Sequence, residues 1–189
     1  MTEIAVDLEA GFTEDKGAFF RREARKQPDK QFVVLGTTVK EKIGKKKSFF
    51  SFLSRPDPTN LNFIPWEAQE TSALPLASGS VDKLYTNMIW GAIYSEKLNE
   101  VKPFEERVEV KNESQIKIFE EVRRVLKAGG VLHMIEIEHE RVPMKQLLIS
   151  AGFDESKIQE KPFTRESYLT NERKGFKNMG MLKEWVISK

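Results

Sequence analysis

Asn87 and Trp90 are residues whose types and spacing could hold a nitrogen-bearing substrate. Asn87 lies near the end of residues 81–89, a run with the composition of a β-strand, and Trp90 directly follows this run. An Asn carbonyl accepts a hydrogen bond from an N–H group, and a Trp ring stacks on a nucleic-acid base with about 1–3 kcal/mol. Ligands of open α/β sheets bind outside the carboxyl ends of the central strands, so this position is a candidate ligand site if the run is a central strand of such a sheet. A core or lid aromatic is the alternative for Trp90.

Chemistry that depends on sulfur or on several histidines is excluded. The chain has no cysteine, which rules out thiol nucleophiles, thiolate metal sites and iron–sulfur clusters. His133 and His139 are too few for a histidine-based zinc site. His133 alternates with Leu132 and Met134 and is expected to be a structural histidine. His139 lies among carboxylates, and its spacing indicates a solvated strand end rather than a metal site.

The net charge of +2 conceals an uneven distribution. Residues 1–15 hold five acidic and no basic residues, whereas residues 16–55 hold twelve Lys or Arg against three acidic residues. Within this basic block, Lys45–Lys47 precede Phe49, Phe50 and Phe52. This combination could contact RNA phosphates, lie on a membrane surface or form only the solvated face of a helix.

Length and composition indicate one globular domain spanning residues 1–189. Apolar residues make up 39% of the chain and charged residues 32%, which is typical of a soluble protein with a core. The longest apolar runs are only a few residues, so no membrane span is predicted. The start of the chain lacks the basic and apolar regions of a secretory signal. We therefore expect a cytoplasmic protein.

Apolar runs and helical spacings alternate along the chain. Helices are predicted over 17–27, 39–53 (basic and amphipathic), 114–126 and 143–151, with Gly129–Gly130 and Gly152 ending the last two. Strands are predicted over 4–8, 32–35, 61–64, 81–89, 131–137, 158–163 and 184–187. This order predicts an α/β fold with a doubly wound, mostly parallel seven-stranded sheet and helices on both faces. The last two strands are joined by too short a connection for a helical crossover, which predicts an antiparallel C-terminal hairpin edge.

Two stretches carry a resemblance to a known family. Residues 74–85 read LPLASGSVDKLY and residues 119–132 read FEEVRRVLKAGGVL. They are similar to the Leu-Pro-Phe, polar turn, Phe-Asp signature and the Val-Leu-Lys-Pro-Gly-Gly join of the class I S-adenosylmethionine-dependent methyltransferases. The two stretches occur at the separation that the family shows, and the predicted elements around them follow the family's order. Together these features imply that family's fold.

The resemblance implies a cofactor turn after the first strand. The family places an acidic residue there, followed by a glycine-rich turn that lets the backbone approach the cofactor. The matching positions are Asp7, Gly11 and Gly17. In an alternative alignment, Gly17 matches the last family glycine at the start of the following helix, and the turn carries an insertion. Glu9 and Thr13 stand in place of family glycines.

The same resemblance bears on two further cofactor contacts. Glu70, followed by Thr71, stands where the family often places an acidic residue against the adenine amino group. An exposed loop glutamate is the alternative for Glu70. The second strand ends in residues 35–38, LGTT, without the carboxylate that usually binds the ribose hydroxyls. Each lost charged hydrogen bond would cost about 1.5–3 kcal/mol of cofactor affinity.

The leading functional prediction is an S-adenosylmethionine-dependent methyltransferase that acts on RNA. The turn after Ile89 is similar to the Pro-Trp-Gly turn of ribosomal RNA methyltransferases that modify an adenine, and the resemblance places Asn87 and Trp90 near the acceptor. The alternative is a methyltransferase-like protein that has lost catalysis and serves as a binding or scaffold partner, which the altered cofactor turn favours. A small-molecule methyltransferase is the third reading. The chain begins at the first strand, so we expect a protein partner to complete the substrate site.

Overall fold

The computed structural model describes residues 3–9, 14–36, 58–66, 73–87, 104–137, 144–163 and 182–189. The predicted helix over 39–53 lies outside these residues. The elements in chain order are β1 (Ile4–Glu9), α1 (Glu14–Lys26), β2 (Gln31–Gly36), β3 (Leu61–Pro65), β4 (Val81–Asn87), α4 (Phe104–Val125), β5 (Leu126–Ile137), α5 (Met144–Ser150), the short 3-10 helix η2 (Glu155–Lys157), β6 (Ile158–Pro162) and β7 (Leu182–Ser188).

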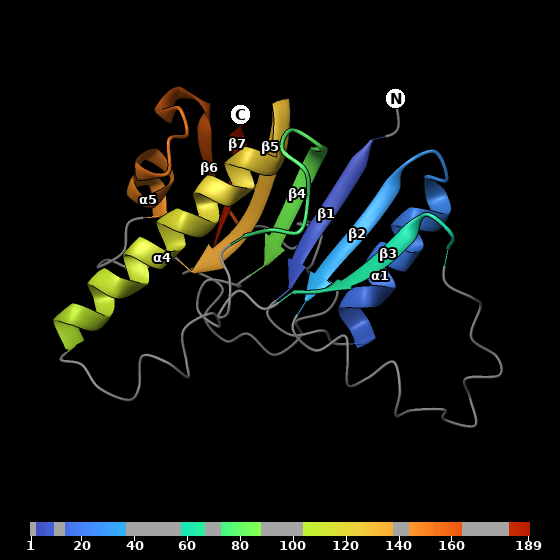
Figure 1. Cartoon of the computed structure of the whole chain (residues 1–189), viewed down its shortest axis with the longest axis horizontal. Coiled ribbons are helices and arrows are strands. Elements are labelled where there is room, and N and C mark those ends of the chain that lie inside the picture. Colours follow the sequence, from blue (N-terminus) through green and yellow to red (C-terminus); the bar gives the residue numbers. More distant parts are fainter. Residues whose placement is uncertain are drawn as a thin grey trace.

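The strands form one sheet in the order β3-β2-β1-β4-β5-β7-β6 (Figure 1). Every pair of neighbouring strands among β1 to β5 is parallel, so the carboxyl ends of these five strands lie at one edge of the sheet. β7 is antiparallel to both β5 and β6. The predicted doubly wound sheet with an antiparallel C-terminal hairpin is confirmed.

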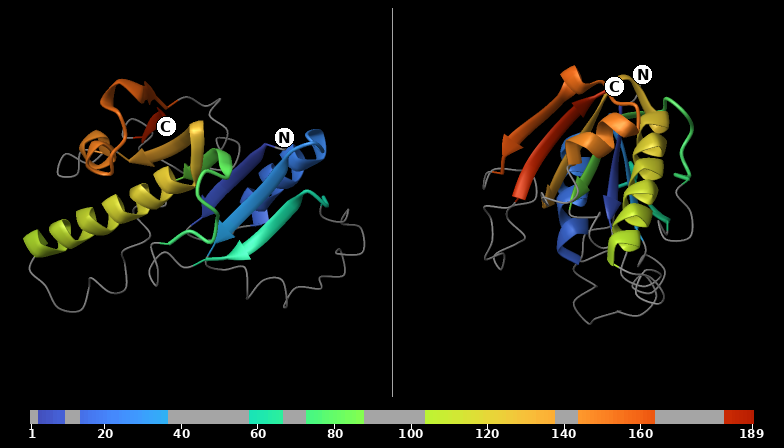
Figure 2. Two further views of the ribbon diagram at one scale, coloured as in Figure 1. Left: turned by 45° about the horizontal axis from the view of Figure 1, so that its top comes forward. Right: turned by 90° about the vertical axis from the view of Figure 1, so that its left-hand side faces the viewer.

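Both faces of the central strands are buried. On β2, Val33 and Leu35 join the apolar cluster beneath α4 and α5, which includes Phe119. The alternate residues Phe32 and Val34 pack in a second cluster with side chains of α1. Figure 2 shows α4 and α5 on one face of the sheet and α1 on the other. Because successive side chains of a strand point to opposite faces, this arrangement explains why β2 is continuously apolar.

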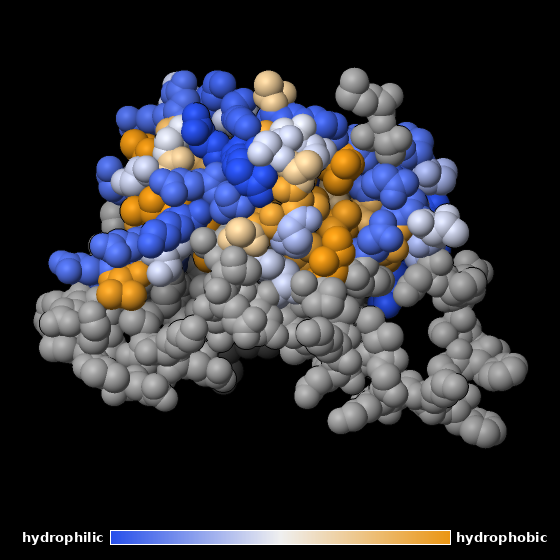
Figure 3. Space-filling model, in the orientation of Figure 1, coloured by the Kyte–Doolittle hydropathy of each residue, from blue (hydrophilic) through white to orange (hydrophobic). Residues whose placement is uncertain are grey.

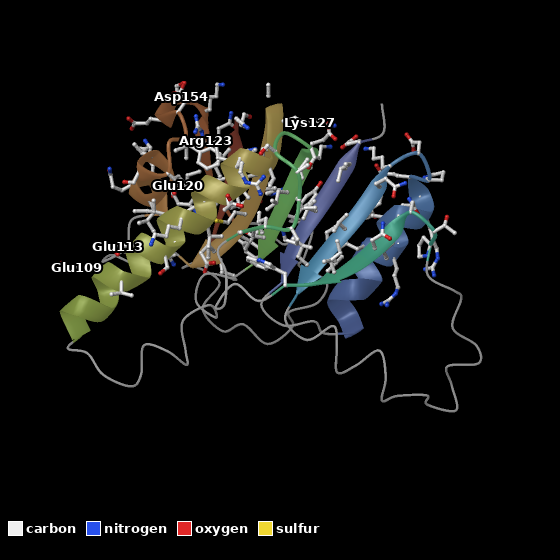
Figure 4. All side chains as sticks on the ribbon, viewed as in Figure 1. Glu109, Glu113, Glu120, Arg123, Lys127 and Asp154 are labelled. Atoms are coloured by element: carbon white, nitrogen blue, oxygen red, sulfur yellow. The ribbon has the colours of Figure 1, made fainter. Side chains whose placement is uncertain are left out.

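α4 is longer than its predicted range and has a hydrophilic outer side. It begins at Phe104, beyond the carboxyl edge of the sheet, and runs back along the sheet to the amino edge (Figure 1). The space-filling view shows a largely hydrophilic surface along this helix (Figure 3). Glu109, Glu113 and Glu120 lie exposed along it, and Arg123 is exposed in its last turn (Figure 4). Acidic residues toward the start and basic residues at the end complement the helix dipole. This outer side faces solvent, and the opposite side supplies the core.

The glycine pair at 129–130 has a different role from the predicted one. α4 ends at Val125 and β5 begins at Leu126, so the prediction that Gly129–Gly130 ends the helix was wrong. Leu126 pairs with Val81 and the next pair is Val131 with Lys83, so β5 bulges between them. A Cβ at Gly130 would lie 3.0 Å from backbone oxygens of Lys127 and Val81. Close packing inside the strand therefore favours glycine at position 130, whereas at position 129 a φ of 75° favours it.

Gly152 ends α5 as predicted. Its φ of 87° lies in the left-handed region that glycine adopts without strain. The N–H of Gly152 bonds to the carbonyl of Ile149 at 2.9 Å, and the N–H of Phe153 bonds to the carbonyl of Leu148 at 3.1 Å. These two bonds satisfy carbonyl groups at the helix end, which is the Schellman arrangement.

The amino edge of the sheet is held by two sets of ion pairs. Glu3 contacts Lys30 at 2.8 Å and Lys83 at 3.2 Å. Asp82 accepts bonds from Lys127 Nζ at 2.6 Å and from the N–H of Ile4 at 2.8 Å. The hydrogen bond from Lys30 lowers the pKa of Glu3. Burial acts to raise the pKa of Asp82, but the bonds from Lys127 and Ile4 outweigh it and lower that pKa.

Acid should weaken this edge. The lowered pKa means that ionised Glu3 stabilises the folded state above its unfolded pKa, and that this contribution is lost as the pH falls below about 4. Glu3→Gln should cost about 1 kcal/mol of unfolding free energy at pH 7, since the pairs are partly exposed. Urea unfolding should show that the two proteins converge as the pH falls to about 3. A difference that stays constant with pH would contradict the ion-pair account.

Candidate functional site

The strand order creates a switch point between β1 and β4. The chain runs outward from β1 to β2 and β3, and then returns to place β4 on the other side of β1. In doubly wound sheets, ligands bind outside the carboxyl ends of the two strands that flank such a switch point. The candidate site is therefore the carboxyl edge of β1 and β4.

Asp7 and Asn87 are brought to this edge by adjacent strands. Asp7 lies on β1 and pairs in register with Tyr85 of β4. Asn87 is the last residue of β4 and pairs with Ile135 of β5. Asn87 stands two residues beyond the partner of Asp7, which is an offset of roughly 7 Å along the strand. A predicted cofactor residue and a predicted acceptor residue thus flank the switch point.

α1 starts at the same edge, but its first residue differs from the predicted one. The helix begins at Glu14, so Gly17 lies within the first turn and not at the helix start. A helix N-terminus attracts polar and anionic groups, and a glycine in its first turn keeps the backbone accessible. Gly11 lies outside the described residues.

Glu9 was not predicted as a site residue, but the strand register places it beside the end of β2. It is the last residue of β1 and pairs with Gly36, the last residue of β2. Neighbouring strands lie about 4.8 Å apart, so a carboxylate-bearing residue stands directly beside the strand end that lacks one. An alignment of β1 and β2 as strands of equal length would have predicted this pairing, but the sequence pattern does not define the last residue of either strand.

Of the remaining predicted site residues, Glu70, Thr71 and Trp90 lie outside the described residues, as does His139. The segment containing Glu70 and Thr71 is nevertheless bounded by described residues. Trp66 precedes it and is 4% exposed, and its Nε1–H donates to the carbonyl of Ala73 at 3.1 Å. The residues on either side of segment 67–72 are thus joined directly.

The polypeptide after this segment is bound to the last turns of α4. Glu121 accepts the N–H of Leu74 at 3.0 Å. Arg124 donates to both Glu121 oxygens at 2.8 Å, and its Nη2 also donates to the carbonyls of Leu74 at 3.1 Å and Leu76 at 3.0 Å. Arg124 Nη1 donates to Ser78 Oγ at 3.0 Å. The guanidinium fork fits this set of acceptors, which an ammonium group could not satisfy together.

Both members of this pair are held in their charged forms. The hydrogen bonds from Arg124 lower the pKa of Glu121, with a further contribution from the N–H of Leu74. The same bonds raise the pKa of Arg124. Charge-assisted hydrogen bonds of this kind are about twice as strong as neutral ones.

His133 is a structural residue, as predicted. Its Nε2 lies 2.7 Å from Glu184 Oε1 on the neighbouring strand β7. Its ring also lies against that of Tyr85, with centroids 5.8 Å apart. This histidine therefore helps to join β4, β5 and β7 on one face of the sheet.

Neither a metal centre nor a membrane helix is found in the described part of the chain. The described residues contain no group of three or more His, Asp or Glu side chains that could hold a metal ion. None of the described helices is both long enough and apolar enough to cross a bilayer.

Methyltransferases of known structure share this architecture. One from Mesorhizobium loti, described as S-adenosylmethionine dependent, has a TM-score of 0.58 at 15% identity, covering 100% of this chain and 91% of that one. The 16S rRNA methyltransferase KamB has a TM-score of 0.60 at 15% identity, covering 98% and 87%. A 30S ribosomal A1408 methyltransferase from an uncultured bacterium has a TM-score of 0.59 at 14% identity, covering 99% and 87%.

These similarities establish the fold. No protein-family model matches the sequence, and no curated protein matches it. The chain has the class I methyltransferase fold, as residues 74–85 and 119–132 predicted, and it matches these structures over nearly its whole length.

Proposed function

We propose that the chain is an S-adenosylmethionine-dependent methyltransferase comprising one domain, residues 1–189. The observation that carries this proposal is the pair Asp7 and Asn87 at the switch point of a methyltransferase fold. This placement supplies one polar residue for a cofactor and one for an acceptor on adjacent strands. The bound cofactor would supply a methyl group that is already activated as a sulfonium.

The chain offers a set of polar contacts for that cofactor. In the proposal Asp7, Gly11 and Gly17 line the turn from β1 to α1, and Glu70 and Thr71 contact the adenine. Glu9 supplies the carboxylate for the ribose hydroxyls, because it is the register partner of the residue that ends β2. A carboxylate can accept both hydroxyl protons of a ribose diol, which the backbone of Gly36 cannot.

Asn87 and Trp90 would orient the acceptor. The Asn87 carbonyl would accept an N–H of the acceptor amine, and the Trp90 ring would stack on the base that carries it. Methyl transfer from a sulfonium depends mainly on positioning, so no strong acid or base is needed. We propose RNA as the acceptor class, with a protein partner that completes the substrate site. Two of the structurally similar proteins are ribosomal methyltransferases, which supports this choice.

RNA binding should depend on salt and on the basic segment. Replacing Lys45, Lys46 and Lys47 together by glutamine should weaken binding of 16S ribosomal RNA and should reduce the slope of log K against log salt by about 2, as three phosphate contacts to single-stranded RNA imply. Filter binding over a range of potassium concentrations measures this slope. An affinity that is independent of salt, or a slope that the triple variant leaves unchanged, would contradict the role of this segment.

The activity itself is tested by transfer of a labelled methyl group. S-adenosylmethionine with a labelled methyl group is incubated with the chain and either 16S ribosomal RNA or a pool of small amines. Label in RNA that is lost in Asn87→Ala supports the proposal. Label only in small amines favours the small-molecule reading, whereas cofactor binding without transfer to either favours the scaffold reading.

We also propose a cytoplasmic location for this enzyme. The whole chain contains no cysteine and therefore no disulfide bond, which is consistent with a reducing compartment.

A further inference from the structure

The inner side of α4 changes from apolar to polar halfway along the helix. In the second half, Ile118, Phe119 and Val122 are buried in the apolar cluster that α4 shares with α5 and the sheet. One turn earlier stands Gln115, whose side chain is only 2% exposed. Residues three and four positions apart share a helix face, so Gln115 faces the sheet as Ile118 and Phe119 do. The apolar side that fixes α4 to the sheet is thus interrupted by an amide.

The buried amide of Gln115 has an unpaired acceptor atom. Its Oε1 accepts no hydrogen bond from the residues that the structure describes, and neither does the buried Oδ1 of Asn112, three residues before it on α4. Asn60 is a contrasting case, since it is 7% exposed and its Nδ2 donates to three backbone carbonyls at 2.8–3.0 Å. A buried acceptor without a donor destabilises the folded state. A donor supplied by a ligand would therefore be bound with a gain in free energy.

Gln115 lies beside the second half of β4. The N–H of Ser80 bonds to the Val125 carbonyl at 2.9 Å, so the end of α4 lies beside the start of β4. From Val125 back to Gln115 the helix extends about 15 Å, which corresponds to about four or five residues of a strand. α4 runs from the carboxyl edge of the sheet to the amino edge (Figure 1), and helical side chains lean toward the helix N-terminus. The Gln115 amide is therefore directed toward the carboxyl edge.

Two more buried polar side chains lie on this face of the sheet near the same edge. Thr86 is 0% exposed, and its register partner Met134 belongs to the apolar cluster beneath α4. Glu136 is 5% exposed and stands two residues beyond Met134, hence on the same face of β5. Three of the four buried polar side chains of the described residues are thus Thr86, Gln115 and Glu136, and Asn60 is the fourth. Their hydroxyl, amide and carboxylate oxygens all accept hydrogen bonds from N–H groups.

The first half of α4, Phe104–Gln115, is the part of the helix that can separate from the sheet. It extends beyond the carboxyl edge (Figure 2), and its described outer residues Glu109 and Glu113 are exposed (Figure 4). On the inner side, the unpaired oxygens of Asn112 and Gln115 replace the apolar contacts of the second half. Elements that open for a ligand are drawn from parts of a structure with few apolar contacts.

We propose that Gln115 binds an N–H group of the methyl acceptor, and that the first half of α4 moves away from the sheet when the acceptor binds. Asn112 supplies a second acceptor oxygen on the same side of the helix. Both amides gain in the complex the donors that they lack in the free chain, which favours the open, bound state. The inference rests on the proposed function, because it takes the ligand to be the acceptor of a methyl group.

The thermal stability of the free chain tests the unpaired amide. Gln115→Met retains the length of the side chain and removes the acceptor, so it should raise the unfolding temperature by about 4 °C. Asn60→Met should lower this temperature by at least about 5 °C, because its three carbonyl partners lose their donor. Gln159→Met makes the same change as Gln115→Met at an exposed position on β6 and should leave the temperature unchanged. If Gln115→Met lowers the unfolding temperature, the amide is already paired within the fold and the inference fails.

Hydrogen exchange of the free chain tests the movement of α4. The amides of residues 110–115 should exchange at least about tenfold faster than those of residues 118–124, which lie above the apolar cluster. In Gln115→Met the amides of residues 110–115 should exchange more slowly than in the wild-type chain, whereas Gln159→Met should leave their exchange unchanged. Exchange of residues 110–115 that is as slow as that of residues 118–124 would show that the first half of α4 does not open, and would overturn the inference.

Transfer of a labelled methyl group to 16S ribosomal RNA tests the role of Gln115 in binding the acceptor. Gln115→Met should raise the KM for RNA about tenfold, as expected when the acceptor of a hydrogen bond is lost, and should leave kcat within about twofold. Gln159→Met should leave both constants unchanged. The affinity for S-adenosylhomocysteine should be the same in all three proteins, because the proposed cofactor contacts do not include Gln115.

The outcomes separate this inference from the proposed function. If the wild-type chain transfers no label to RNA, the proposed function is wrong and the role of Gln115 falls with it. If the wild-type chain transfers label and Gln115→Met retains the wild-type KM while its unfolding temperature rises, Gln115 affects only stability. In that case the inference is overturned and the proposed function stands.

Discussion

Asp7→Asn should weaken binding of S-adenosylhomocysteine about thirtyfold. The residue lies on β1 at the switch point, paired in register with Tyr85 of β4. The substitution retains the size of the side chain and removes the charge, so it removes a charge-assisted hydrogen bond worth about 2 kcal/mol. Calorimetric titration of the wild-type chain and the variant measures the difference.

The same titrations should include a control variant and a second test variant. Asp29→Asn alters an exposed carboxylate in the turn between α1 and β2, at the opposite edge of the sheet, and should leave the affinity unchanged. Glu9→Gln should weaken binding by about tenfold if Glu9 holds the ribose hydroxyls. An unchanged affinity in Asp7→Asn would show that the cofactor lies elsewhere. An unchanged affinity in Glu9→Gln alone would leave the cofactor site in place but remove Glu9 from it.

Phe119→Ala should destabilise the chain by about 4 kcal/mol. Phe119 is fully buried on α4, within the apolar cluster that joins α4 and α5 to the sheet. Truncation of the ring removes its burial and leaves a cavity that the surrounding strands cannot fill. Urea unfolding followed by circular dichroism measures the loss.

Glu120→Ala is the control for this change. The neighbouring side chain is exposed on the outer side of α4 (Figure 4), and its removal should alter the unfolding free energy by less than about 0.5 kcal/mol. If Phe119→Ala costs as little as Glu120→Ala, then α4 does not pack on the sheet in the way described.

The sheet could be predicted because its signals are local. The run FVVL at residues 32–35 is continuously apolar, and the structure buries alternate residues of it in two different clusters. The antiparallel hairpin edge was also predicted, and β6 and β7 pair antiparallel. Residues 163–181 connect these strands, and roughly a dozen residues are enough for a crossover, so the length of the connection was not a sufficient reason for that prediction. The inference about residues 32–35 requires only the periodicity of side chains along a strand.

Other features could not be read from the sequence. The first turns of α4 are rich in charged residues and contain only three apolar ones, Phe104, Val108 and Val110, so the helix was predicted to begin ten residues late, at Ser114 rather than Phe104. Gly129–Gly130 is typical of a helix end, and only the strand register reveals the bulge. The pairing of Glu9 with Gly36 likewise depends on register.

The positions of two candidate site residues on neighbouring strands follow from the strand order. Asp7 lies on β1, two residues before the end of that strand, and Asn87 ends β4; their roles in binding stay predictions. The hydrogen bonds of Arg124, by contrast, go to backbone carbonyls that are distant in sequence. Residue types alone predict neither the partners nor the geometry of such bonds. The Arg124 and Glu121 pair therefore emerged only from the structure.

Calorimetric titration of the wild-type chain with S-adenosylhomocysteine tests the central claim most directly. One molecule should bind per chain with a dissociation constant in the micromolar range, and bound ligand should raise the unfolding temperature. Absence of binding at millimolar ligand would contradict the claim that this methyltransferase fold holds the cofactor.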